Sequence, residues 1–476
     1  MAFKSNLTLF ITFAFLFTFC EQKEKESPIL EGSTSELTIF FINDQHGQID
    51  NFSKVKHIVD QERAKTNTLL VCAGDMFSGN PIVDQYKDKG FPMIDVMNQT
   101  GFDVAVLGNH EFDYGTTALK ERMGQAEFAW VCANVDMQES GVPQPNPFVT
   151  VDLDGLKITF LGLVETFGKP GAIIPATHPW RVSELKFERH YDVISQYADL
   201  KSAENSDILV ALTHLGSRAD RELAIYAPFL DLVIGGHSHE QLNDQVGSVS
   251  IVQAGSYLNL LGKISLTIQD QKIIGREISF IDLREYTDED QSLKQTIEAY
   301  NDAPEFDQVV GYATAYHDRT ALGCFYTDAL KAYLDVDVSF QNRGGIRADI
   351  NEGNITKMEI YQMDPFNNQS VTFTLTAGEL SDFFKETQQG LYVSGITFEE
   401  EGGTLYVLDE NGIRYAEDDI ITIGTNDYIP SVHDSYFPLE KAVINELTTA
   451  ETIIEYLVTI QDTVSRDGCN KYYRYN

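Results

Sequence analysis

Seven short apolar runs between residues 37 and 257 constrain the fold more than any other feature of this chain. They are "LTIFFIND", "LLVCAGD", "VAVLGNH", "ITFLGLVE", "ILVALTHLG", "LVIGGHSH" and "IVQAGSY". Segments with apolar residues at helical spacing, such as 53–64 and 116–125, lie between some of these runs. Strands that are buried on both faces and separated by helices predict an α/β sandwich for this part of the chain.

The pattern changes near residue 283. The segment "REYTDEDQSLKQTIEAYNDAPEF" predicts a polar helical connector without a strong apolar face. A second α+β unit follows, with the strand-like runs "VDVSFQN", "VTFTLT" and "IITIGTN". A chain of 476 residues exceeds what one compact core usually holds, so two domains are expected. We predict a first domain over 37–285, a linker helix within 286–308 and a second domain over 309–476.

The N-terminus, "MAFKSNLTLFITFAFLFTFCEQKEKE", predicts a secretory signal over residues 1–20. Its apolar core is too short for a spanning helix and ends at Cys20, where charged residues begin. A cysteine at this junction resembles the lipid acceptor of a bacterial lipoprotein, although Phe19 stands where a small residue is usual. We expect an exported protein, in the periplasm or at the cell surface and lipid-anchored to a bacterial membrane. Ordinary secretion and an uncleaved anchor are the alternatives. Residues 21–36 predict a flexible tether.

Net charge restricts the partners of the protein. Acidic residues outnumber basic ones 72 to 35, which gives a formal charge of −37. Such a chain repels nucleic-acid polymers and anionic membranes at long range, so we expect a small-molecule ligand and membrane contact only through a lipid on Cys20. The other four cysteines lack the spacing of a zinc cluster; Cys72 and Cys132 lie in apolar runs and are expected to be buried thiols. Sequence alone leaves disulfide pairing open.

Metal-competent side chains stand where five of the apolar runs end. They are Asp44 and His46, Asp75, Asn109 and His110, His214, and His237 and His239. Ligands bind beyond the carboxyl ends of the strands in open α/β sheets, so these groups are expected to converge. A single histidine or aspartate at such a position is usually a hydrogen-bonded core residue or a helix cap. The joint pattern exceeds that explanation and predicts a metal site.

These motifs carry a family resemblance. The succession D-x-H, G-D, G-N-H-E, a lone H and G-H-x-H resembles the binuclear metallophosphoesterases. "GNHEFDYG", "GGHSH", "QAGSY", "NRGGIRADI" and "MDPFNNQ" are similar to the 5′-nucleotidase branch, which is related to periplasmic UDP-sugar hydrolases. The resemblance covers nearly all of the mature chain. It implies a four-layer α/β/β/α metallophosphatase sandwich followed by an α+β nucleotide-binding domain.

The resemblance also implies roles for the residues at the strand ends. Asp44, His46 and His239 would hold one metal, Asn109, His214 and His237 a second, and Asp75 would bridge them. Such ligands suit Zn²⁺, Mn²⁺, Co²⁺ or Fe²⁺ better than Ca²⁺. His110, oriented by Asp113, would stabilise the transition state. Glu111 is expected either to support the site or to be an acid in the first turn of a helix.

In the second domain, Arg343 and Arg347 flank "GGI", and arginine forks match phosphate or carboxylate. The resemblance implies substrate recognition by both, base stacking by Tyr428 and ribose binding by Asp434. The sequence departs from the family at Val432 and His433, which replace a glycine pair. The first stacking ring is also out of register, with Tyr392 close by. These side chains could instead be solvated charges or packing residues.

Together these features predict an exported two-metal phosphohydrolase that releases phosphate from nucleoside 5′-monophosphates and related nucleotides, in a scavenging role. Binding at a domain interface would also require hinge motion, for which the connector near 290–303 is a candidate. The alternatives on the same fold are hydrolysis of a UDP-sugar, a 2′,3′-cyclic nucleotide or a sugar phosphate. A related branch acts on protein-bound thiosulfonate, but the intact "NRGGIR" favours nucleotides. A catalytically silent surface-binding protein is disfavoured by the complete metal set.

Overall fold

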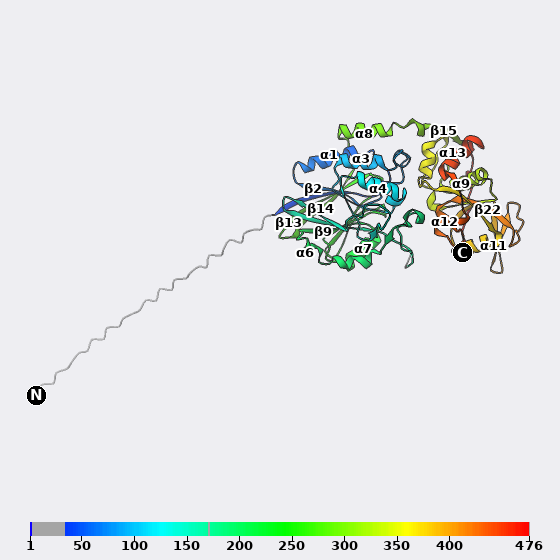
Figure 1. The fold of residues 1–476 in the computed structure, drawn as a ribbon. Coiled ribbons are helices and arrows are strands. Elements are labelled where there is room, and N and C mark those ends of the chain that lie inside the picture. Colours follow the sequence, from blue (N-terminus) through cyan, green and yellow to red (C-terminus); the bar gives the residue numbers. More distant parts are fainter. Residues whose placement is uncertain (2–33, 170–171, 476) are drawn as a thin grey trace.

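The computed structural model describes Met1, residues 34–169 and residues 172–475. The predicted signal segment, its Cys20 and nearly all of the predicted tether therefore lie outside the described residues. Two units lie side by side, the first drawn from blue to green and the second from yellow to red (Figure 1). In the described part of the chain, none of the helices has the length and apolar composition that a membrane crossing requires.

The first unit is built on two six-stranded sheets. One has the order β14-β13-β1-β2-β3-β4, with bounds Lys272–Asp282, Leu260–Gln269, Ser35–Ile42, Asn67–Cys72, Val104–Val106 and Ala129–Val131. The other has the order β11-β12-β10-β9-β7-β6, with bounds Gln241–Val246, Val249–Ala254, Leu232–Ile234, Ile208–His214, Leu156–Val164 and Phe148–Leu153. Strands β1, β2 and β3 of the first sheet run parallel to one another, as do β7, β9 and β10 of the second, so within each sheet their carboxyl ends lie at one edge.

Alternating side chains of β1 show how the layers form. Ile39 and Phe41 pack between the two sheets, whereas Phe40 and Ile42 pack under helices on the outer face. Successive residues of a strand point to opposite faces, so an uninterrupted apolar run is what a strand covered on both sides requires.

Helices cover the outer face of each sheet. The first is covered by α1 (Phe52–Arg63), α3 (Phe91–Thr100), α4 (Gly115–Gln125) and α8 (Gln291–Asn301). The second is covered by α5 (His190–Val193), α6 (Leu200–Ala203) and α7 (Ser217–Tyr226). This is the predicted four-layer α/β/β/α sandwich.

The second unit is the predicted α+β domain. Its main sheet has the order β23-β18-β22-β16-β19-β25, with bounds Val443–Thr448, Gln369–Thr376, Ile420–Asn426, Val338–Asn342, Leu391–Ser394 and Tyr472–Tyr473. On one side pack α9 (Arg319–Leu334), α10 (Lys357–Met363) and α13 (Thr449–Thr459). The other side packs against α11 (Ala377–Thr387) and the hairpin of β20 (Ile396–Glu401) and β21 (Thr404–Asp409). A small sheet adds β15 (Val309–Ala313), β17 (Gly353–Thr356) and β24 (Thr463–Val464).

The connector helix differs from its sequence description. Helix α8 buries Leu293 and Ile297 against the helices of the first domain, and the Tyr300 hydroxyl donates to Asp95 at 2.8 Å. These two apolar side chains lie one turn apart and form a narrow apolar face on α8. The many polar residues of the segment had predicted a helix without such a face. The helix therefore packs as part of the first domain before the chain enters β15 (Figure 1).

The cysteines fall into two classes. Cys72 and Cys132 are buried free thiols, as predicted. Cys324 of α9 forms a disulfide with Cys469, a pairing that the sequence left open. Asp328, one turn along α9, also pairs with Arg466 and Lys471. The C-terminal segment is thus attached to α9 by one covalent link and two ion pairs.

Candidate metal centre and active site

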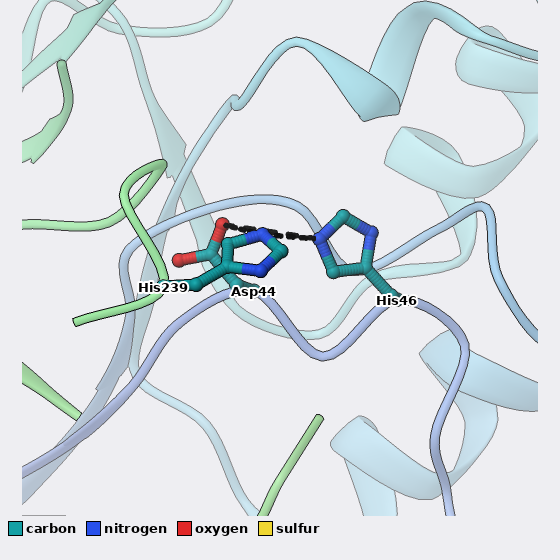
Figure 2. A group of neighbouring side chains, drawn as sticks. All are labelled: Asp44, His46 and His239. Carbon is teal, nitrogen blue, oxygen red and sulfur yellow. Dashed lines mark hydrogen bonds and ion pairs between the residues drawn. The ribbon is translucent and has the colours of Figure 1, made fainter. Parts of the chain in front are cut away.

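The strand ends bring the predicted metal ligands together. Three groups of side chains have ligand atoms within 4.8 Å of one another: Asp44, His46 and His239; Asp75, His214 and His237; and His46, Asp75 and His110. Figure 2 shows how Asp44, His46 and His239 converge from two loops. Asn109 joins the second group, because its Oδ1 lies 3.0 Å from Nδ1 of His237.

The backbone at these positions is unusual. Five of the seven predicted ligands have positive φ: Asp44, His46, Asp75, His237 and His239. Non-glycine residues adopt this region rarely, and such residues cluster at functional sites because the surrounding structure must hold them there. The strand ends are therefore shaped to aim side chains inward rather than to continue regular structure.

The histidine tautomers fit metal binding. Nδ1 of His214 donates to the carbonyl of Ala73 at 2.7 Å, and Nδ1 of His46 donates to the carbonyl of Ser78 at 3.1 Å. Each Nε2 faces the centre: that of His214 lies 2.9 Å from Oδ2 of Asp75, and that of His46 lies 2.9 Å from Nε2 of His239. A backbone carbonyl that fixes the far nitrogen is the usual support of a metal-bound histidine.

Charge at the centre also fits cations. Burial and the nearby His110 cation lower the pKa of His46 to about 3, and burial with His214 lowers the pKa of His237 to about 4. Both imidazoles are therefore neutral near pH 7, the form that binds metal. Burial alone would raise the pKa of Asp75, but His214 and His110 lower it well below its usual value. The donor set of imidazoles and carboxylates matches divalent transition metals.

His110 and Asp113 form the expected pair. The Nδ1 of His110 donates to Oδ2 of Asp113 at 2.6 Å. Burial opposes a charge on His110, but Asp113 and Asp75 raise the pKa of His110 to about 9. The backbone N–H of His110 also donates to Oδ1 of Asp75 at 2.9 Å. His110 is thus a protonated imidazole held beside the predicted bridging carboxylate.

Glu111 supports the site. It lies in the one-turn helix η1 (His110–Phe112), and its fully buried carboxylate accepts the backbone N–H groups of Gly108, Asp75 and Met76. The side chain therefore ties the loop after β2 to the loop after β3. A solvated acid at a helix end would not point inward in this way.

A cavity of about 690 Å³ lies between the two domains and opens onto this centre. Asp75, Asn109, His110, Asp113, His237 and His239 line its first-domain wall, while Arg319, Asn342, Arg347, Phe366, Asn368 and Tyr428 line its second-domain wall. Phe366 stacks on the ring of His110 at 6.2 Å between centroids, and the Arg347 guanidinium lies 5.6 Å from the centroid of Phe366.

Not every predicted substrate residue reaches this cavity. Arg347 and Tyr428 line it, whereas Arg343 and Asp434 are exposed and do not. Tyr392 is 1% exposed and belongs to the second-domain core, so it is a packing residue and not a stacking ring. Its ring lies against Gly323 of α9, where a Cβ would come within 2.4 Å of the ring.

Several cavity residues escaped the sequence interpretation. His178 and Arg181 come from an irregular loop with no periodicity, and Tyr257 and Phe366 stand in the quoted motifs "QAGSY" and "MDPFNNQ" without an assigned role. Only Tyr257 and Phe366 could have been identified from the sequence, because each is an aromatic residue within a motif of the family.

Comparison with known families accounts for this arrangement. Residues 37–241 match the calcineurin-like phosphoesterases, and residues 299–437 match the 5′-nucleotidase C-terminal domain. The chain thus combines a calcineurin-like phosphoesterase domain with a 5′-nucleotidase C-terminal domain. The 5′-nucleotidase precursor of Thermus thermophilus has the same fold, with a TM-score of 0.75, 23% identity and coverage of 92% of this chain and 98% of its own.

Two curated relatives differ in length. The trifunctional nucleotide phosphoesterase protein YfkN of Bacillus subtilis is 26% identical over 84% of this chain, which spans only 32% of YfkN. A 5′-nucleotidase of Vibrio parahaemolyticus is 26% identical, and the match covers 74% of each protein. The chain thus corresponds to about a third of one relative and to most of the other.

Proposed function

We propose that the protein is a two-metal phosphohydrolase that releases phosphate from nucleoside 5′-monophosphates and related nucleotides. The observation that carries the proposal is the cavity, which has the metal-competent centre on one wall and Arg347 with Tyr428 on the opposite wall. A phosphate ester placed there would have its phosphoryl group at the centre and its nucleoside against the second domain.

Two of the three groups of converging side chains support the following assignment of ligands. Asp44, His46 and His239 would hold one ion, and Asn109, His214 and His237 the other. Asp75 would contact both. When bound, two divalent ions supply Lewis acidity and positive charge toward the phosphoryl oxygens, and Zn²⁺, Mn²⁺, Co²⁺ and Fe²⁺ all suit this donor set.

The remaining chemistry falls to the side chains of the cavity. Because Nδ1 of His110 is held by Asp113, its Nε2 carries a proton toward the cavity, where it can stabilise the negative charge that develops on the ester. The Arg347 guanidinium makes no hydrogen bond within the described residues, so its donors remain free for phosphate or ribose oxygens. Tyr428 would present a flat face to the base.

One observation favours a second candidate. Since Tyr392 is in the core, only one of the two predicted base-stacking rings lines the cavity. Weaker binding of the base would be compatible with a UDP-sugar or a 2′,3′-cyclic nucleotide as well as with a monophosphate. One relative, YfkN, is named a trifunctional nucleotide phosphoesterase, which implies more than one nucleotide reaction for that protein.

A substrate panel tests both candidates. Phosphate release from AMP, UDP-glucose, 2′,3′-cyclic AMP and a sugar phosphate is measured with the chain lacking residues 1–26. The first proposal expects the highest kcat/KM with AMP, and a higher value with another substrate would favour the second. No turnover with any of the four, with metal bound, would contradict both and support a binding protein.

Export is a separate part of the proposal, carried by the signal-like residues 1–20. We expect the mature protein to begin at Cys20 with a lipid attached. Mass spectrometry of the N-terminal peptide tests this, because an unmodified Cys20 would indicate plain secretion or an uncleaved anchor.

A further inference from the structure

One arginine of the first domain contacts the second domain beside the active site. Arg181 lies in the helix η2 (Pro179–Val182), in the loop that follows β7. Its Nη1 donates to the carbonyl of Phe366 at 3.0 Å, and its Nη2 donates to the carbonyl of Asn367 at 3.1 Å and to Oδ1 of Asn368 at 3.2 Å. Three acceptors of one second-domain loop thus share a single guanidinium.

The same guanidinium also binds the first domain. Nη1 of Arg181 donates to the backbone carbonyl of Asp113. Asp113 is the residue whose carboxylate accepts from His110, and its Oδ1 accepts from the hydroxyl of Thr177 at 2.8 Å. Arg181 therefore fixes the backbone of the residue that orients His110.

Both residues joined by Arg181 contact His110. Asp113 holds the Nδ1 side of the ring, and Phe366 stacks on its face with an interplanar angle of 24°. A planar fork with five donors can serve four acceptors in fixed directions, whereas a lysine ammonium has three donors and no preferred plane. The contact set is specific to arginine.

We propose that Arg181 is a positioning residue that sets His110 against the second domain, so that the imidazole is correctly placed when the Phe366 loop is docked. The inference rests on the proposed phosphohydrolase function. Because His110 acts on charge that develops in the transition state, loss of its position should lower kcat more than it raises KM.

The chain supplies a matched control. Gln85 of the first domain donates to Oδ1 of Asn367 at 2.8 Å. It binds the same second-domain loop, and among the described residues no hydrogen bond joins it to Asp113 or His110. If Arg181 only ties the domains together, removing either tie should have similar kinetic consequences.

The test compares Arg181→Ala, Arg181→Lys and Gln85→Ala with wild type in steady-state phosphate release from AMP. Arg181→Ala is expected to lower kcat by about 10- to 100-fold while KM changes by less than about threefold, since a misplaced general acid typically loses this much. Arg181→Lys should recover at most part of kcat, and Gln85→Ala should stay within about threefold of wild type.

The outcomes separate this inference from the proposed function. Equal kcat losses in Arg181→Ala and Gln85→Ala, or an effect of Arg181→Ala on KM alone, would overturn the positioning role while wild type remains active. A wild-type protein that releases no phosphate would overturn both. Arg189 lies eight residues further along the chain and its side chain binds the carbonyl of Gly168; Arg189→Ala monitors nonspecific effects of losing an arginine and should match wild type.

Discussion

The buried carboxylate of Glu111 gives a prediction whose size follows from the structure. Its Oε2 accepts the N–H groups of Asp75 and Gly108, and its Oε1 accepts that of Met76. Leaving a buried donor unpaired costs about 1–3 kcal/mol, so Glu111→Ala, which removes both acceptor oxygens and leaves three donors unpaired, should cost about 4 kcal/mol or more. Glu111→Gln keeps an oxygen for two donors and should cost about 1–3 kcal/mol.

Guanidinium unfolding followed by tryptophan fluorescence measures these losses. Both tryptophans, Trp130 and Trp180, belong to the first domain, so the signal reports that domain alone. Chelator removes any contribution from bound metal. Burial raises the pKa of Glu111 to about 7, so the measurement is made at pH 8, where the carboxylate is ionised.

Glu111 could instead act only as an acid in the first turn of a helix. An acid that only complements a helix end contributes about 0.3–1 kcal/mol. A loss below about 1 kcal/mol for Glu111→Ala would therefore show that the three backbone donors do not depend on this side chain. Glu121→Ala, at an exposed position of α4, is the control and should change stability by less than about 0.5 kcal/mol.

Three further predictions concern the second domain. Arg347→Ala should lower kcat/KM for AMP by about 10- to 100-fold while sparing p-nitrophenyl phosphate, because a charged hydrogen bond contributes about 1.5–3 kcal/mol; equal losses on both substrates would argue against recognition of the nucleoside and indicate contact with the phosphate. Burial raises the pKa of Asp364 to about 6, so its contribution to stability is complete below pH 3.8 and is lost as the pH rises through 6. The free energy of unfolding of Asp364→Asn, relative to that of wild type, should consequently rise by about 3 kcal/mol between about pH 4 and 7.5, measured by unfolding followed by circular dichroism. A difference between the two proteins that does not change with pH would contradict the burial argument. Replacing Cys324 and Cys469 by serine should cost the second domain about 2–5 kcal/mol, measured in the same way, with the tryptophan transition of the first domain unchanged; an unaltered second-domain transition would refute the anchoring role of the disulfide.

Much of the first domain could be predicted because its signals are local. Phe40 and Phe41 are buried on opposite faces of β1. The uninterrupted apolar run around them therefore predicts a strand covered on both sides, even when the segments that cover it are unknown. The polar residues that end these strands, from Asp44 to His239, converge for the same reason, since parallel strands place equivalent ends at one edge.

What sequence could not reveal depends on packing between distant segments. Tyr392 stands near the position of a stacking ring in the sequence. Because Gly323 has no side chain, it leaves a space on α9, and the ring of Tyr392 fills this space in the core. Arg181 lies in a loop without periodicity, and its role emerges only where two domains meet. Polar letters around Leu293 and Ile297 likewise hid the apolar face of α8.

The central claim is that the strand-end cluster holds two metal ions that the reaction needs. Its most direct test is phosphate release from AMP, measured together with metal content per chain, for wild type and Asp75→Asn. The account predicts about two divalent ions in wild type, activity that is lost on chelation and returns with added metal, and a kcat for Asp75→Asn that is lower by orders of magnitude. Near-normal kcat in Asp75→Asn, or full wild-type activity after the metal is removed, would contradict it.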